Sequence, residues 1–141
     1  MTLVVDASVA LKWFVLEADS EAAERLLENA APLHAPTLLM SEFANGLWKN
    51  RKRDLIDAEQ AQRALATLPR SINVWRPTDR YLGEALGMAM ALDHPIYDMV
   101  YLAMARESGA RVVTADQRFL RRVSGTAHES QVIALANWRP A

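Results

Sequence analysis

The stretch TLVVD, residues 2–6, is a short apolar run of the kind that forms a buried parallel strand, and it ends on an acid. A similar run, RVVT at residues 111–114, leads to Asp116 near the other end of the chain. Between them, segments with helical spacing alternate with strand-like runs, and no hairpin dipeptide joins two strands. This alternation predicts an α/β fold, a three-layer α/β/α sandwich around a mainly parallel sheet.

The expected elements follow from hydrophobic spacing and from residues that cap or break helices. Strands are expected at residues 2–6, 33–35, 72–75, 111–114 and 131–133, and helices at residues 7–15, 20–31, 38–51, 57–68, 79–92, 95–108 and 119–123. Ser8 is a candidate cap for the first helix. In such a sheet a ligand binds outside the carboxyl ends of the strands, where the strand order reverses. Asp6 and Asp116 both lie at such an end.

Length and composition narrow the class of protein. The 141 residues, 51% of them hydrophobic and 23% charged, predict one globular domain over residues 1–141. The apolar runs are too short to span a bilayer, and the amino terminus lacks a basic region followed by an apolar stretch. We therefore expect a soluble, cytoplasmic protein without membrane contact. The absence of cysteine excludes disulfides, thiolate catalysis and cysteine-based zinc sites.

Asp98 is the hardest acid to explain as an ordinary surface residue. It lies in HPIYDMVYLAMA, residues 94–105, a predicted helix that is apolar all the way round and therefore buried. The helix dipole favours an anion in the first turn by only about 0.3–1 kcal/mol, whereas desolvating an unpaired carboxylate costs several kcal/mol. No lysine or arginine stands three or four residues away. The missing counter-charge is either an arginine elsewhere in the fold or a metal ion.

The other three acids each have an ordinary interpretation. Asp6 and Asp116 fit helix caps or turn residues, and Glu42 fits a solvated stripe with Asn45 and Lys49, although its neighbours are mostly apolar. If the four acids converge, one pair of carboxylates 4 Å apart costs about 4 kcal/mol at an effective dielectric of 20. A divalent cation turns this repulsion into binding energy, and all-oxygen ligands select Mg²⁺ or Mn²⁺. Such a site suits phosphodiester hydrolysis, with Asn45 as a supporting residue.

The net charge of −1 argues against a nucleic-acid partner, unless several acids are neutralised in a metal site and leave the remaining surface basic. The densest cationic run is KNRKR, residues 49–53. It either complements the dipole at the end of a helix or contacts an RNA backbone. The candidate substrate-binding residues are Lys12, Lys49, Arg51 and Arg118, the last of which lies close to Asp116 in the sequence.

Four segments resemble the PIN-domain ribonucleases, and they occur in the same order. They are VVDASVALKW (4–13), Ser41-Glu42 at a helix start, IYDMVYLAMA (96–105) and VVTADQRF (112–119). The size and spacing are similar to those of the toxin of bacterial VapBC toxin–antitoxin pairs, and the likeness extends from Thr2 to about Ile133. It implies a metal site made by Asp6, Glu42, Asp98 and Asp116, with Ser8 and Thr114 as helper hydroxyls.

The resemblance also implies a mechanism and partners. As an endoribonuclease the protein would hydrolyse RNA with Mg²⁺ held by Asp6, Asp98 and Asp116 and a second ion near Glu42, and it would leave a 5′-phosphate. Mn²⁺ is expected to substitute for Mg²⁺. The implied partners are an RNA substrate, a cognate antitoxin protein and a second copy of the chain, with the homodimer inside a toxin–antitoxin hetero-oligomer.

Several alternatives stay open. Trp13, Phe14 and Trp48 fit either the core or a groove for an antitoxin segment, and the methionines between residues 88 and 104 fit either the core or a dimer seam. The three histidines share no metal-ligand spacing and are expected to be structural or surface residues.

The competing functions are a PIN-type RNA-processing nuclease without an antitoxin, a phosphoryl-transfer or receiver-like α/β domain, and a binding module with an inert site. A receiver-like domain would need paired acids after the first strand, which the sequence lacks. Four intact acids speak against an inert site.

Overall fold

The computed structural model describes residues 2–29 and 31–140 and forms, within them, five strands and seven α-helices. All strand pairs are parallel, and the order across the sheet is β3-β2-β1-β4-β5. The predicted parallel sheet is therefore confirmed. The strands are β1 (Leu3–Val5), β2 (Leu33–Pro36), β3 (Val74–Arg76), β4 (Arg111–Thr114) and β5 (Val132–Ala134).

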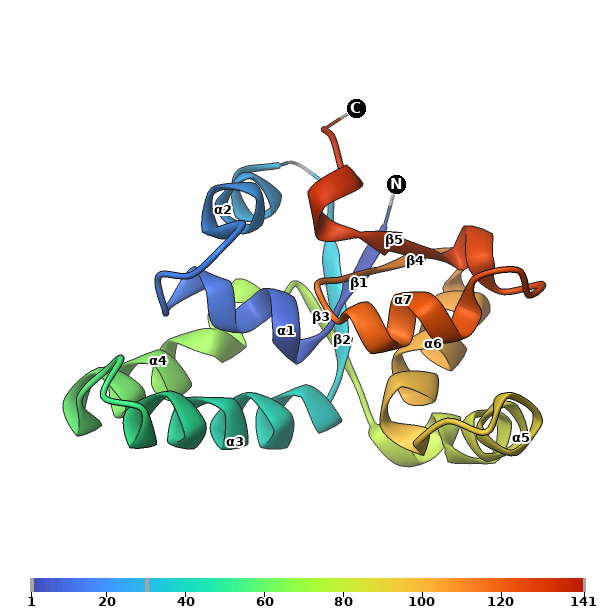
Figure 1. The fold of residues 1–141 in the computed structure, drawn as a ribbon, viewed down its shortest axis with the longest axis horizontal. Helices are drawn as coiled ribbons and strands as arrows, with labels where there is room; N and C mark the ends of the chain where they lie inside the picture. The colour runs from blue at the N-terminus through green and yellow to red at the C-terminus, as the bar shows by residue number, and fades with distance from the viewer. Residues whose placement is uncertain (1, 30, 141) are drawn as a thin grey trace.

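Helices cover both faces of the sheet, which confirms the predicted three-layer sandwich (Figure 1). On one side lie α1 (Ala7–Ala10), α2 (Ser20–Glu28), α3 (Leu38–Lys52) and α4 (Ala58–Ser71). On the other side lie α5 (Leu82–Leu92), α6 (Ile96–Ser108) and α7 (Gln117–Val123). None of the described helices is both long and apolar enough to cross a membrane.

Helix α6 is central to the hydrophobic core, as its apolar sequence predicts. Every residue from Met99 to Ala105 is buried, and α6 packs between the central strands and α5. Burying a large apolar side chain stabilises a fold by about 1.5–3 kcal/mol. This packing holds α6 firmly, and it fixes the position of Asp98, which lies in the first turn of the helix.

The predicted helix over residues 7–15 is shorter in the structure. Helix α1 is a single turn that tightens into a 3-10 turn at Leu11–Trp13. Its N-cap is Asp6, whose side chain accepts a hydrogen bond from the Val9 amide, so the prediction that Ser8 caps this helix is wrong. Strand β1 leads into α1 through Asp6 alone, which leaves Ser8 inside the helix with its hydroxyl bonded to Asp6.

Several other boundaries differ from the predictions. Helix α4 extends to Ser71 rather than to residue 68, α5 begins at Leu82 after a 3-10 turn rather than at residue 79, and α7 begins at Gln117 rather than at residue 119.

The third strand begins at Val74, two residues later than predicted. The Asn73 side chain accounts for this, because its Oδ1 accepts a hydrogen bond from the amide of Leu33, the first residue of β2, at 2.7 Å. The helix that begins at Ser20 ends at Glu28 rather than at residue 31, and residue 30 lies outside the described residues.

The strand order reverses beside β1. The chain passes from β1 to β2 and β3 on one side, and then crosses to β4 and β5 on the other. Val5 pairs with Val113, so Asp6 and Thr114 emerge next to each other at the carboxyl edge of the sheet. This is the point at which open parallel sheets bind their ligands.

Candidate active site

Asp6 is the buried centre of the site, with only 4% of its surface exposed. Its Oδ1 accepts hydrogen bonds from the Ser8 hydroxyl at 2.6 Å and from the Val9 amide at 3.2 Å. Its Oδ2 accepts a short hydrogen bond from the fully buried Thr114 hydroxyl. The hydroxyls of Ser8 and Thr114, which the sequence predicts to support the site, therefore both contact Asp6.

The same two hydroxyls fix the loop that follows β4. Ser8 Oγ accepts from the Ala115 amide at 2.9 Å, and Thr114 Oγ1 accepts from the Asp116 amide at 3.0 Å. Asp116 then caps α7, since its Oδ1 accepts from the amides of Arg118 and Phe119 at 2.9 and 3.4 Å. The ordinary interpretation of Asp116 as a cap is thus correct, and it leaves the other carboxylate oxygen without a hydrogen bond from a described residue.

Asp98 has a partner that is neither an arginine nor a metal ion, the two predicted from the sequence. His94 Nε2 lies 2.6 Å from Asp98 Oδ2, and the imidazole stacks on Phe119 with ring centroids 6.2 Å apart. Pro95 is the N-cap of α6 rather than its first residue, so the His94 backbone lies outside the helix and its ring folds back onto the first turn. The spacing of four residues between His94 and Asp98 is about one helical turn, and it was the signal in the sequence that could have identified this partner.

Glu42 also has an unforeseen partner. The fully buried Tyr101 of α6 donates its hydroxyl to Glu42 Oε1 at 2.7 Å. A buried tyrosine usually satisfies its hydroxyl with such an acceptor. The apolar helix thus carries both Asp98 and the residue that orients Glu42. The signal in the sequence was a tyrosine one turn after Asp98 in a helix predicted to be buried.

Three of the acids have raised pKa values. Burial is the largest cause for Asp6, whose pKa rises to about 7 although the hydroxyls of Ser8 and Thr114 favour the ionised form. Burial also raises the pKa of Glu42 and of Asp98, against the hydrogen bonds from Tyr101 and His94.

The charges of the acids act on one another as well. The charge of Asp98 raises the pKa of Asp6 and of Glu42, and the charge of Asp116 raises the pKa of Glu42 and of Asp98. Only Arg118 and His94 oppose this at Asp98, since their charges lower its pKa. The four acids nominated from the sequence therefore form one electrostatic cluster with an excess of negative charge.

The chemistry of this cluster fits a hard divalent cation. Asp98, Glu42 and Asp116 each receive all their hydrogen bonds on one oxygen, so that Oδ1, Oε2 and Oδ2 respectively receive none from the described residues. Across residues 2–29 and 31–140, however, no three histidine, aspartate or glutamate side chains lie close enough together to hold one ion. Mg²⁺ keeps several waters and commonly binds through one or two carboxylates, so this spacing and the donor set are compatible with it.

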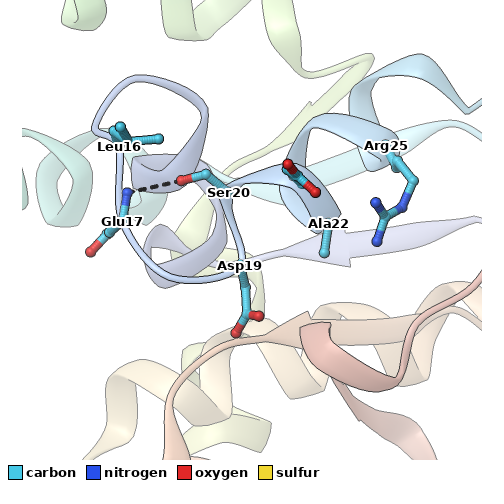
Figure 2. A pocket seen from close by; sticks show the side chains of 7 residues that line it. Leu16, Glu17, Asp19, Ser20, Ala22 and Arg25 are labelled. Carbon is cyan, nitrogen blue, oxygen red and sulfur yellow. Dashed lines mark hydrogen bonds between the residues drawn. The ribbon is translucent and has the colours of Figure 1, made fainter.

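The predicted substrate-binding cations lie in different environments. Lys12 points to a loop: its Nζ donates to the Ala18 carbonyl at 2.7 Å and lies 3.9 Å from Glu17. Figure 2 shows how this loop is fixed, because the Glu17 amide donates to the Ser20 hydroxyl at 3.0 Å. Arg51 pairs with the exposed Asp54 at 3.3 Å.

The remaining candidates are exposed. Lys49 lines a cavity next to Ser8, and Arg118 lies on α7 near Asp98. Asn45 makes no side-chain hydrogen bond to a described residue, so its supporting role stays a prediction.

Residues 3–125 match the PIN domain family, and the chain therefore belongs to this family, as its motifs predict. Its curated relatives include VapC nucleases. Ribonuclease VapC3 of Pyrobaculum aerophilum is 33% identical over 120 residues, covering 84% of this chain and 92% of that protein. Ribonuclease VapC9 of Mycobacterium tuberculosis is 39% identical over 116 residues, covering 82% and 87%. Exonuclease VapC9 of P. aerophilum is 31% identical over 134 residues, covering 94% and 95%.

A solved structure supports the same fold. A chain of a toxin–antitoxin complex from Klebsiella pneumoniae superposes with a TM-score of 0.68 over 95% of this chain and 98% of that chain. At 16% sequence identity this likeness bears on the fold alone.

Proposed function

We propose that the protein is a single-domain, metal-dependent endoribonuclease and the toxin of a toxin–antitoxin pair, acting on RNA in the cytoplasm. The observation that carries the proposal is the cluster of four acids at the reversal of strand order, three of them with raised pKa values. Two curated relatives named as ribonucleases support the choice of RNA as the substrate.

The proposed cation is Mg²⁺, with Mn²⁺ as a substitute. Asp6, Asp98 and Asp116 would hold it, one or two of them directly and the rest through bound water, because no three of the described acids lie close enough together to hold one ion directly. Glu42 would hold a second position. When bound, the cation would neutralise the acids and favour attack of water on phosphorus. The protein keeps the acids oriented: Ser8 and Thr114 hold Asp6, His94 holds Asp98, and Tyr101 holds Glu42. Water forms the new bond to phosphorus and the bond to O3′ breaks, which leaves a 5′-phosphate and a 3′-hydroxyl.

A circular single-stranded RNA tests this function. We expect the purified protein to open the circle with Mg²⁺ or Mn²⁺, to be inactive in EDTA, and to leave 5′-phosphate ends that accept ligation without prior phosphorylation. Cleavage of linear RNA but not of the circle would make the protein an exonuclease, as one relative is named. Equal cleavage with EDTA would reject the metal, and 2′,3′-cyclic phosphate ends would reject attack by water.

His94→Ala should lower kcat/KM for RNA cleavage by about 10–100-fold, the usual cost of losing a residue that orients a metal-binding side chain. His94→Gln should recover part of the loss, because the glutamine amide can reach Asp98 much as Nε2 does. His128→Gln is the matched control, since His128 contacts Arg106 and Gln131 instead. Mn²⁺ titration of each variant provides a second measurement, and a normal Mn²⁺ affinity in His94→Ala would contradict the positioning role.

We propose that an antitoxin segment binds between α3 and α4. A cavity of about 280 Å³ opens there between the two helices, and 57% of the Trp48 surface is exposed beside it. Trp13 and Phe14 are already packed, Trp13 by a hydrogen bond to the Ala23 carbonyl and Phe14 edge-on against Phe43. Trp48→Ser should therefore weaken capture of a co-expressed antitoxin, whereas unchanged capture would remove this groove from the interface.

We propose that α5 forms the homodimer seam. Leu82, Leu86 and Met90 follow one another at intervals of four residues and are 41%, 51% and 71% exposed, whereas Met88, Met99 and Met104 are buried. Two glycines of α5 have open space above them, so a second helix can approach closely. Leu86→Glu should halve the mass measured by light scattering. Leu55→Glu, at an exposed leucine in the α3–α4 connection, should leave the mass unchanged, and equal masses for both variants would refute this seam.

A further inference from the structure

A cavity of about 250 Å³ lies next to the acid cluster, between the first helical segment, α3 and the loop after β4. Ser8 and Ala115 line its end nearest to the acids, and Ser8 is itself bonded to Asp6 at 2.6 Å. The cavity is large compared with the roughly 30 Å³ that one water occupies in the liquid. A molecule in it would lie one side chain, Ser8, away from Asp6.

The wall that α3 contributes is the same helix face that carries Glu42. Gly46, Lys49 and Arg53 line the cavity, at four, seven and eleven residues after Glu42. With a rise of 1.5 Å per residue, Lys49 lies about 10 Å and Arg53 about 16 Å beyond Glu42 along the axis. One face of α3 therefore extends from the acid cluster to two cations.

The four cations of residues 49–53, at the end of α3, lie in two different environments. Arg51 pairs with Asp54 at 3.3 Å, and Lys52 lies over the Trp48 ring, 5.3 Å from its centroid. Lys49 and Arg53, in contrast, make no ion pair or side-chain hydrogen bond to any residue in the described part of the chain. Two unpaired cations thus border the cavity, and two engaged cations lie elsewhere on the same run.

A third cation is built into the wall. Lys12 is only 11% exposed at its side chain, and its bond to the Ala18 carbonyl holds it beside the cavity. Among the described residues, Glu17 is the one acid that lines the cavity, and it lies 3.9 Å from Lys12. The lining therefore has three cations and one acid, which gives it a net positive charge beside a strongly negative cluster.

We propose that this cavity binds a backbone phosphate of the RNA strand, on one side of the cleaved bond, through Lys49 and Arg53. The inference rests on the proposed nuclease function and adds a place for the substrate strand. Arginine can bind two oxygens of one phosphate at once, and lysine supplies a point charge. Neither contact recognises the identity of the base. Phosphate contacts of this kind hold a single strand in a charged groove without sequence preference. An acidic peptide would use the same cations, and the test distinguishes it.

The test compares two double variants that remove the same charge. Lys49→Ala with Arg53→Ala removes the two unpaired cations of the cavity lining. Arg63→Ala with Arg70→Ala is the matched control, since both are exposed cations of α4 that do not line the cavity, and Arg63 pairs with Glu59 instead. With single-stranded RNA and Mg²⁺, we expect the Lys49/Arg53 double variant to raise KM at least about 10-fold with little change in kcat. The slope of log KM against log salt concentration should fall by about 0.7, the value for one phosphate contact on a single strand. The control should change KM less than about 3-fold, with melting temperatures confirming that both fold.

Each outcome decides the inference. Equal KM values for the two double variants would mean that the cations act only as general surface charge, and would overturn the phosphate site. An unchanged KM with lost binding of a co-expressed antitoxin would assign the cavity to an acidic peptide instead. If the wild type cleaves no RNA, the nuclease function itself fails, and anisotropy of a labelled oligonucleotide still measures whether Lys49 and Arg53 bind it.

Discussion

Asp6→Asn should lower kcat/KM for RNA cleavage by on the order of 10³-fold, similar to the loss of a main electrostatic group in other active sites. The asparagine oxygen can still accept from Ser8 and Val9, and the Thr114 hydroxyl can rotate to accept from the new amide, so the shape of the site is kept. What is lost is the negative charge that would hold the cation. Single-turnover cleavage with saturating Mg²⁺ measures this effect without a contribution from product release.

Asp57→Asn is the matched control for this substitution. Asp57 is also an aspartate N-cap, bonded to the Gln60 amide at 2.7 Å at the start of α4, and asparagine caps a helix about as well as aspartate. Its cleavage rate should equal that of the wild type. If Asp6→Asn retains more than about a tenth of the wild-type rate, well above the expected residual activity, the cluster is not the catalytic centre.

The edge of the sheet on which the acids lie could be predicted from the sequence because the information is local. An apolar run that ends on an acid marks the carboxyl end of a strand, and parallel strands bring these ends together. The same reasoning applied to Asp98, because an apolar helix is buried wherever it packs. In each case a few adjacent residues carried the argument.

The partners of the acids were harder to predict because they depend on contacts between distant segments. Tyr101 meets Glu42 across 59 positions in the sequence, and α6 and α3 lie on opposite faces of the sheet, so only the tertiary fold brings the two side chains together. The two environments of the cations in residues 49–53 are a related case. A helix turns about 100° per residue, so its four cations cannot share one face, but the face that borders the cavity is set by where α1 packs.

Without a divalent cation, the protein should lose stability as the pH rises. The pKa of Asp6 is about 7 in the folded protein and 3.8 when unperturbed, so its contribution is fully present below about pH 4 and is lost as the pH rises through 7. At pH 8 the ionised carboxylate would cost on the order of 4 kcal/mol. The raised pKa values of Glu42 and Asp98 act in the same direction.

Urea unfolding in EDTA at pH 5, 6, 7 and 8 measures this loss, and Asp6→Asn isolates the part that belongs to Asp6. The variant should be more stable than the wild type at pH 8, and the gap should narrow toward pH 5. Mg²⁺ should then stabilise the wild type at pH 8 and have little effect on it at pH 5. It should not stabilise the variant at either pH, because a ligand stabilises the folded state only where it binds. A gap that does not change with pH would mean that Asp6 ionises normally. Equal stabilisation of both proteins by Mg²⁺ would mean that the ion binds without Asp6, and the buried carboxylate would then need a structural explanation.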